Sequence, residues 1–271
     1  MKFRRTVRAA IAIFAFLAVF SITSSLADDS SAREKLAQAQ RTFEAREDSA
    51  QLDAALALLE QVTAETQDAE LSYTARILES RCWHRKGHVT ENAETRKELH
   101  QKGMLAAEAA KTLNDAYADS YFLFAINLAS WAQANGVIAS LARKAELIAH
   151  LNGALGRNTQ GGQKGEAIDG WGPNRVLGRL YFKLPGFAGG SHSKAVELLT
   201  QAVEQAPDHS GNFVYLAEAL LDGSEAEKAL ARDLVTNALA RASESWDPKR
   251  VPETREELVR LKKLISSDQN F

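Results

Sequence analysis

The chain has 271 residues, and its 33 Lys and Arg nearly balance its 35 Asp and Glu, giving a net charge of −2. This balance argues against a nucleic-acid-binding protein, which carries a basic surplus. The single cysteine excludes an internal disulfide framework and a cysteine-based zinc finger. Ala, Leu, Glu, Lys and Gln dominate and β-branched runs are scarce, so the composition favours an all-α protein.

Residues 1–27 have the three parts of a secretory signal peptide. The first part is positive, and its basic residues are Lys2, Arg4, Arg5 and Arg8. An uncharged apolar run follows over residues 9–22, and Ser25 and Ala27 put small side chains at the −3 and −1 positions. We expect cleavage before Asp28. The alternative is an uncleaved membrane anchor, for which the run is short, because a span needs about 20 residues.

Cleavage has consequences for charge and location. It removes four basic residues, so 29 Lys and Arg face 35 Asp and Glu and the net charge becomes −6. No cysteine lies near the cleavage site, so we expect no bacterial lipid anchor. The sequence therefore predicts an acidic, exported protein, which is periplasmic if the source is a Gram-negative bacterium.

Residues 28–271 are predicted to form one domain of successive helices, because apolar residues recur at helical spacing. The predicted helices are 31–46, 51–66, 70–86, 93–113, 118–134, 137–155, 173–183, 193–206, 210–221, 225–242 and 251–265. The segment 118–134 is apolar nearly all round, which predicts the most buried helix. Residues 156–172 contain six glycines and form a long loop, which is either functional or mobile.

The helix spacing fits a tetratricopeptide repeat, which uses about 34 residues for two antiparallel helices. The residues that match its two helices are Leu177, Gly178, Tyr181, Ala195, Ala202 and Pro207. An insertion of about five residues lies between them, within 184–192. Because one repeat cannot bury its own apolar face, several must stack. We predict an all-α, short solenoid of tetratricopeptide-like helix pairs; the alternative is a plain helical bundle.

Two adjoining stretches are more specific than this repeat pattern. They read Gly172-Pro173-Asn174-Arg175-Val176-Leu177-Gly178-Arg179-Leu180-Tyr181 and Leu184-Pro185-Gly186-Phe187-Ala188-Gly189-Gly190-Ser191. With these stretches, residues 90–240 resemble the T component of TRAP transporters, a family of periplasmic tetratricopeptide-repeat proteins.

The resemblance implies a non-enzymatic partner of a TRAP-type substrate-binding protein, which captures a solute for a secondary transporter in the inner membrane. Family members can form ring-like oligomers whose cavities pass ligand to the partner, so a homo-oligomer is one expectation. Some members are lipoproteins, but this sequence lacks their cysteine. The alternative is a generic envelope scaffold for protein–protein interaction, with no transported ligand.

Patterns for catalysis or metal binding are weak. His84 and His88 lie four apart on one helical face, a spacing that can hold a metal. Gly87, however, marks a predicted helix end, where cations are ordinary. No nucleophile motif lies near the other histidines, and no phosphate-binding motif follows the glycines of 161–165. We expect no enzymatic activity, no cofactor and no metal.

Asp169, Trp171, Arg175 and Arg179 are the first candidates for binding, because the two arginines share one helical face. In a functional interpretation, these residues line a groove that holds a carboxylate or an acidic segment of a partner. In the alternative, which we favour, an arginine pairs with Asp169 or caps loop carbonyls and so fixes the loop shape.

Aromatic and glycine residues supply further candidates. Tyr121, Phe124 and Trp131 line a cavity for a small apolar ligand in one interpretation, and pack in the core in the other, which we favour. The glycines of the inserted loop, Gly186, Gly189 and Gly190, are expected to adopt backbone angles closed to other residues. Ser191 or Ser193 is expected to cap the following helix.

Overall fold

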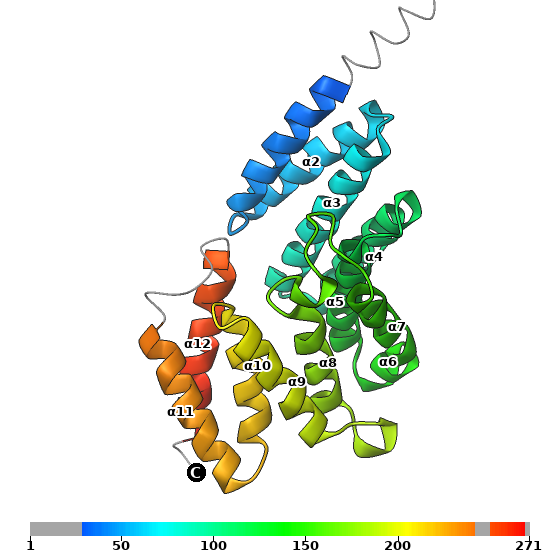
Figure 1. Cartoon of the computed structure of the whole chain (residues 1–271). Helices are drawn as coiled ribbons and strands as arrows, with labels where there is room; N and C mark the ends of the chain where they lie inside the picture. Colours follow the sequence, from blue (N-terminus) through cyan, green and yellow to red (C-terminus); the bar gives the residue numbers. More distant parts are fainter. Residues whose placement is uncertain (1–28, 242–249, 269–271) are drawn as a thin grey trace, which may run out of the picture.

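The computed structural model describes residues 29–241 and 250–268. Within these ranges, all regular secondary structure is helical, as the sequence predicts (Figure 1). The predicted signal peptide, residues 1–27, lies outside the described residues. No described helix is both long enough and apolar enough to cross a membrane.

The first half of the chain consists of helices that each reverse direction on their predecessor. Residues 29–44 form a helix, which is followed by α2 (Ser49–Glu65), α3 (Ala69–Val89), α4 (Ala93–Leu113) and α5 (Ala118–Asn135). Asp48, Asp68 and Asn92 accept hydrogen bonds from backbone N–H groups of the first turns of α2, α3 and α4. Such caps satisfy donors that lack a partner within the helix, so short polar residues set these starts.

Three predicted helices differ from the structure by three residues or more. Helix α12, predicted to end at residue 265, ends at Asp268. Helix α3 continues past Gly87 to Val89. Gly87 is needed inside the helix because an added Cβ would lie 2.6 Å from the ring of His100 on α4. The predicted helix 137–155 is two helices, α6 (Val137–Ala142) and α7 (Lys144–Leu155), which meet at Arg143.

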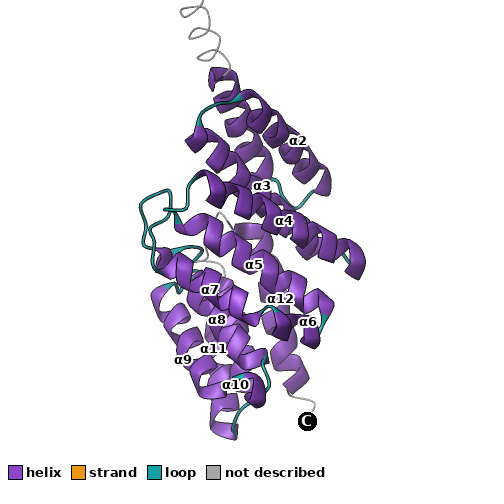
Figure 2. Cartoon of the chain, turned by 90° about the vertical axis from the view of Figure 1, so that its right-hand side faces the viewer, coloured by secondary structure: helices purple, strands orange, loops and turns teal. Residues whose placement is uncertain are grey.

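The second half is made of helix pairs, α8 (Gly172–Lys183) with α9 (His192–Gln205) and α10 (Ser210–Leu221) with α11 (Glu225–Arg241). The last helix, α12 (Val251–Asp268), packs on α10 and α11 (Figure 1). Figure 2 shows the described residues as helices joined by loops. Helix α10 buries nine of its 12 residues, whereas α5 buries nine of 18, so the prediction that α5 is the most buried helix is wrong. Helix α10 is enclosed because it packs against α8, α9, α11 and α12.

The repeat residues lie where α8 and α9 approach closely. A Cβ on Gly178 would lie 2.7 Å from Leu199 Cγ and 3.2 Å from the Ala195 carbonyl oxygen, so only glycine fits. Ala195, Leu199 and Ala202 are fully buried. Of the other motif residues, Leu177 is buried and Gly172 packs on the Phe122 ring. The two prolines lie at helix ends: Pro173 is in the first turn of α8, and Pro207 follows the end of α9.

Ion pairs join the two ends of the described chain. Arg46 donates two hydrogen bonds of 2.8 Å to the carboxylate of Glu253, and Arg85 donates two, of 2.6 and 3.2 Å, to Glu256. Both arginines are buried, and both acids lie in the first turns of α12. Figure 1 shows the start of α12 beside the turn that precedes α2. The last helix thus connects the second half of the chain to the first.

Candidate functional site

The glycine-rich loop 156–172 is fixed to the helices beside it. Its Asn158 carbonyl accepts a 2.8 Å hydrogen bond from Ala118 N, and Gln160 N donates one of 2.7 Å to the Asp119 carboxylate. The Gln160 side chain also donates to Thr74 Oγ1, at 2.8 Å, on α3. The loop tip is therefore held against α3 and α5.

The loop ends in three successive residues with left-handed backbone, Asp169 (φ 49°), Gly170 (φ 59°) and Trp171 (φ 62°). Asp and Gly adopt this conformation readily, but a bulky residue such as Trp rarely does. An added Cβ on Gly170 would lie 2.5 Å from the His209 ring, so glycine is required for space as well. Such a conformation persists only where neighbouring contacts impose it.

Arg175 supplies those contacts. Its side chain is buried, and Nη1 donates to the carbonyl oxygens of Asp169 (2.9 Å) and Gly170 (3.0 Å) and to Asn212 Oδ1 (2.9 Å). Nη2 donates to Asp169 Oδ2 at 2.5 Å. This geometry agrees with the pairing of an arginine with Asp169 that we favoured, and it directs the donors of Arg175 into the protein.

The network around Asp169 continues to α10 and α12. Burial opposes ionisation of the Asp169 carboxyl, but Arg175, His209 and Arg250 hold its pKa well below the ordinary value. Burial and the charge of Arg175 lower the pKa of His209. His209 Nδ1 lies 3.3 Å from Arg250 Nη1, and Arg250 pairs with Glu257. The side chain of Asp169 is 39% exposed, so the network reaches solvent there.

Arg179 does not join this network. Its guanidinium stacks on the ring of Tyr215 at 4.3 Å, and Arg260, which pairs with Glu218, lies 5.5 Å from the same ring. Among the described residues, no ion pair of Arg179 is found. The four predicted groove residues therefore do not form one group. Asp169 and Arg175 are in direct contact, and Trp171 is half-buried beside them. Arg179 lies apart from them, over the ring of Tyr215.

The aromatic candidates lie where α5 packs on α7. Phe124 is buried and stacks on His150 at 3.9 Å. Tyr121 is half-buried and lies 4.1 Å from the Arg157 guanidinium, while Trp131 lies 5.1 Å from that of Arg143. These contacts are the core packing that we favoured for this set.

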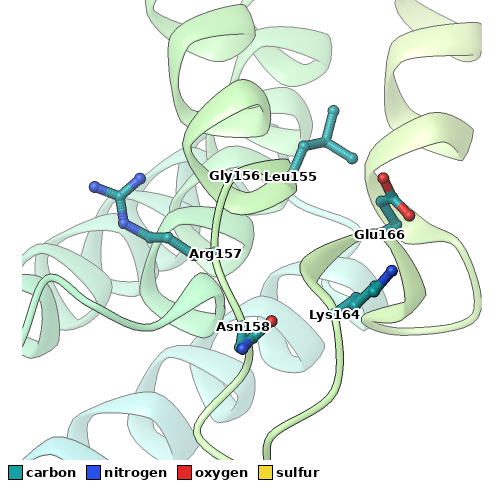
Figure 3. Close-up of a pocket in the computed structure, with 6 residues that line it drawn as sticks. All are labelled: Leu155, Gly156, Arg157, Asn158, Lys164 and Glu166. Atoms are coloured by element: carbon teal, nitrogen blue, oxygen red, sulfur yellow. The ribbon is translucent and has the colours of Figure 1, made fainter.

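Two shallow depressions occur elsewhere, and neither includes a predicted site residue. The first, of about 270 Å³, is lined by Leu155, Gly156, Arg157, Asn158, Lys164 and Glu166. In Figure 3, Lys164 and Glu166 lie together on one side, while the Arg157 side chain points away from them. The second, of about 450 Å³, lies where Gln160 meets residues 33–40 and 68–74. In the sequence, only the glycines of the loop, with Lys164 and Glu166 between them, indicated this region.

Glycine is not required at every position of the inserted loop. Gly189 has φ 87°, and a Cβ on Gly190 would lie 1.8 Å from the Leu184 carbonyl oxygen. Neither Gly186 nor Gly190 has a positive φ, so the expectation of special backbone angles is wrong for both. Gly190 is required for space instead, whereas an added Cβ on Gly186 has no neighbour within 4 Å. Ser191 caps α9 by accepting a hydrogen bond from Lys194 N.

The histidine pair of α3 is occupied by other contacts. His88 Nε2 lies 3.1 Å from Glu256 Oε2, and His84 Nε2 lies 3.4 Å from Ser130 Oγ. Burial lowers the pKa of His84 to about 3. In the described part of the chain, no three His, Cys, Asp or Glu residues gather as a metal site would require.

Comparison with known proteins gives no assignment: no protein-family model and no curated protein matches this chain.

Proposed function

We propose that the protein is an exported, non-enzymatic helical-repeat protein, built as a short solenoid of tetratricopeptide-like pairs. It acts as an accessory partner of a TRAP-type substrate-binding protein in solute uptake. Its proposed location is the periplasm. Assembly into a homo-oligomer and binding of a small apolar or carboxylate ligand are further parts of the proposal.

The α8–α9 hairpin is the observation that carries the proposal. The residues of the TRAP-like stretch have positions that explain their identity: Gly178 permits close packing against α9, Arg175 fixes the preceding loop, and Gly190 fits against the Leu184 carbonyl. A stretch that builds a specific hairpin and loop is stronger support than general helical periodicity. Helix pairs of this kind stack into extended surfaces that bind other proteins.

The alternative is a generic envelope scaffold, and affinity capture separates the two. The mature chain, immobilised from residue 28, is incubated with periplasmic extract of the source organism, and bound proteins are quantified by mass spectrometry. An unrelated acidic helical protein of similar size is the control bait. We expect specific enrichment of a TRAP-type substrate-binding protein. Enrichment of envelope-assembly proteins without any substrate-binding protein would contradict the proposal.

A further inference from the structure

The first turns of α12 meet the first half of the chain through acidic and basic side chains. We call this contact the seam, and its residues are Glu253, Arg255 and Glu256 of α12 with Arg46, Glu47, Arg85 and His88. Arg255 Nη1 donates to Glu47 Oε1 at 2.7 Å. His88 Nε2 lies 3.1 Å from Glu256 Oε2. These contacts add to the paired hydrogen bonds of the two buried arginines.

The apolar cores on the two sides of the seam are separate. The cluster that contains Leu261 of α12 takes its residues from α9, α10, α11 and α12. The cluster that contains Leu52 of α2 takes its residues from the helix 29–44, α2 and α3. The seam therefore joins two units that each have a core of their own, and it joins them by ion pairs.

A third apolar cluster links the two halves along the route of the chain itself. It extends from Tyr73 of α3 through α4, α5 and α7 to Leu177 of α8. In a solenoid each helix pair needs only its neighbours for stability, so a contact between the first and last helices is not needed to keep them folded. Loss of the seam would separate the two ends (Figure 1) and leave the helices of both halves packed.

The bases and the acids of the seam differ in exposure. Arg46 and Arg85 are 8% and 6% exposed, whereas the side chains of Glu253 and Glu256 are 23% and 43% exposed. Burial opposes ionisation of both acids, but hydrogen bonds from basic side chains lower their pKa values, that of Glu256 to about 2. Both acids are therefore charged at neutral pH.

This asymmetry makes the seam sensitive to the charge of its acids. Water reaches the carboxylates and competes for the ion pairs, which limits their net contribution to stability. A buried guanidinium that loses its carboxylate is costly, and exposure to water removes that cost. Neutral side chains at positions 253 and 256 would therefore favour separation of α12 from the turn before α2 and from α3.

We propose that the seam is an ionic latch, which holds the first turns of α12 against the first half of the chain and opens when its carboxylates lose their charge. In the closed form the latch covers the guanidiniums of Arg46 and Arg85. In the open form both guanidiniums are accessible to solvent and to anionic groups of other molecules. The alternative is a seam that stays closed whatever the charge of its acids.

A distance between two spin labels distinguishes the two forms. Val89→Cys at the end of α3 and Val259→Cys on α12 supply labelling sites that are 44% and 68% exposed and lie outside the seam. The native Cys82 is fully buried, and burial raises the pKa of its thiol to about 12, so it does not take the label. Pulsed electron paramagnetic resonance then gives the distribution of distances.

The test variant carries Glu253→Gln with Glu256→Gln. The matched control is Glu146→Gln, which breaks an ion pair with Arg143, three residues away and outside the seam. We expect one short distance in the wild-type chain and in the control. In the test variant we expect most molecules to show a longer distance, with the helical circular dichroism of the wild type.

The accessibility of the arginines gives an independent measurement. Phenylglyoxal modifies exposed guanidiniums, and mass spectrometry of peptides locates the modified residues. We expect Arg46 and Arg85 to react at least tenfold faster in the test variant than in the wild-type chain. Arg33, whose side chain is 61% exposed, should react equally in both.

Three results would overturn the latch. The first is a short distance that persists in the test variant, which would show that the seam stays closed without its charges. The second is an equal lengthening in the Glu146→Gln control, or loss of the helical signal in the test variant, because the change would then be general unfolding. The third is a longer distance with unchanged reactivity of Arg46 and Arg85, because the seam would then not be what covers them.

Discussion

Arg175 and Asp169 form an ion pair, with 2.5 Å between Nη2 and Oδ2, that fixes the end of the glycine-rich loop just before α8 begins. The same guanidinium binds the carbonyl oxygens of Asp169 and Gly170, so one side chain holds the first two of three consecutive left-handed residues. The loop shape in front of α8 thus depends on a residue of α8.

Arg175→Ala is therefore expected to destabilise the protein. The change leaves the Asp169 and Gly170 carbonyls and the Asn212 side chain without this donor, which costs about 1–3 kcal/mol. Urea unfolding followed by circular dichroism measures the loss. The control is Arg255→Ala, whose ion pair with Glu47 is exposed and is worth at most about 1 kcal/mol. Equal stability of the Arg175 variant and wild type would show that the loop does not need the arginine.

Two glycine substitutions test the α8–α9 contact, because an added Cβ has close neighbours at Gly178 and none within 4 Å at Gly186. Gly178→Ala places a methyl group 2.7 Å from Leu199 Cγ, so we expect a loss of about 1–3 kcal/mol from overpacking. At Gly186 an added Cβ meets nothing within 4 Å, so Gly186→Ala should leave stability unchanged or raise it by about 0.4–1 kcal/mol. Thermal melts of both variants give the comparison, and equal melting temperatures would contradict the packing described for this hairpin.

Acid should destabilise the protein in two steps. Burial lowers the pKa of His100 to about 4, so the unfolded chain takes up a proton near pH 6.5 that the folded chain does not. Stability is then lost as pH falls below about 6.5, by on the order of 2 kcal/mol at pH 5 from this residue.

Glu256 has a pKa lowered to about 2, because its bonds to His88 and Arg85 outweigh burial. Its contribution is present above about pH 4.3 and is lost as pH falls toward 2.

The histidine step can be isolated with His100→Gln. This variant removes the titrating group, so the slope of unfolding free energy against pH between 7 and 5 should become shallower than in wild type, whatever the absolute stability of the variant. Urea unfolding at several pH values supplies the slopes. Identical slopes would mean that His100 is protonated in the folded protein as easily as in the unfolded chain.

Export predicts a processed N-terminus. Mass spectrometry of the protein purified from the envelope fraction of its source should give a first residue at or near Asp28, because positive, apolar and small residues follow one another over 1–27. Detection of the intact chain beginning at Met1 in that fraction would contradict the proposed export.

Local features of the fold were predictable from the sequence, because helical periodicity and capping act over a few residues. The bounds of α4, α10 and the first residues of α5 and α12 agree with the apolar pattern. The pairing of Arg175 with Asp169 was also predictable, because Arg175 follows Asp169 by only six positions.

Distant contacts were not predictable in this way. Arg46 and Glu253 are 207 residues apart, and nothing in their local sequence signals the bond. The need for glycine at position 87 inside α3 comes from the His100 ring on α4, and the left-handed Trp171 depends on contacts around its neighbours. The predicted groove residues lie apart for a similar reason. Arg179 shares a helical face with Arg175, but its guanidinium stacks on the ring of Tyr215 on α10.

Sedimentation velocity of the mature chain mixed with the purified TRAP-type substrate-binding protein tests the central claim most directly. We predict a new, faster boundary that contains both proteins and grows with concentration. If each protein sediments in the mixture as it does alone, at concentrations up to the solubility of either, the proposed partnership is contradicted.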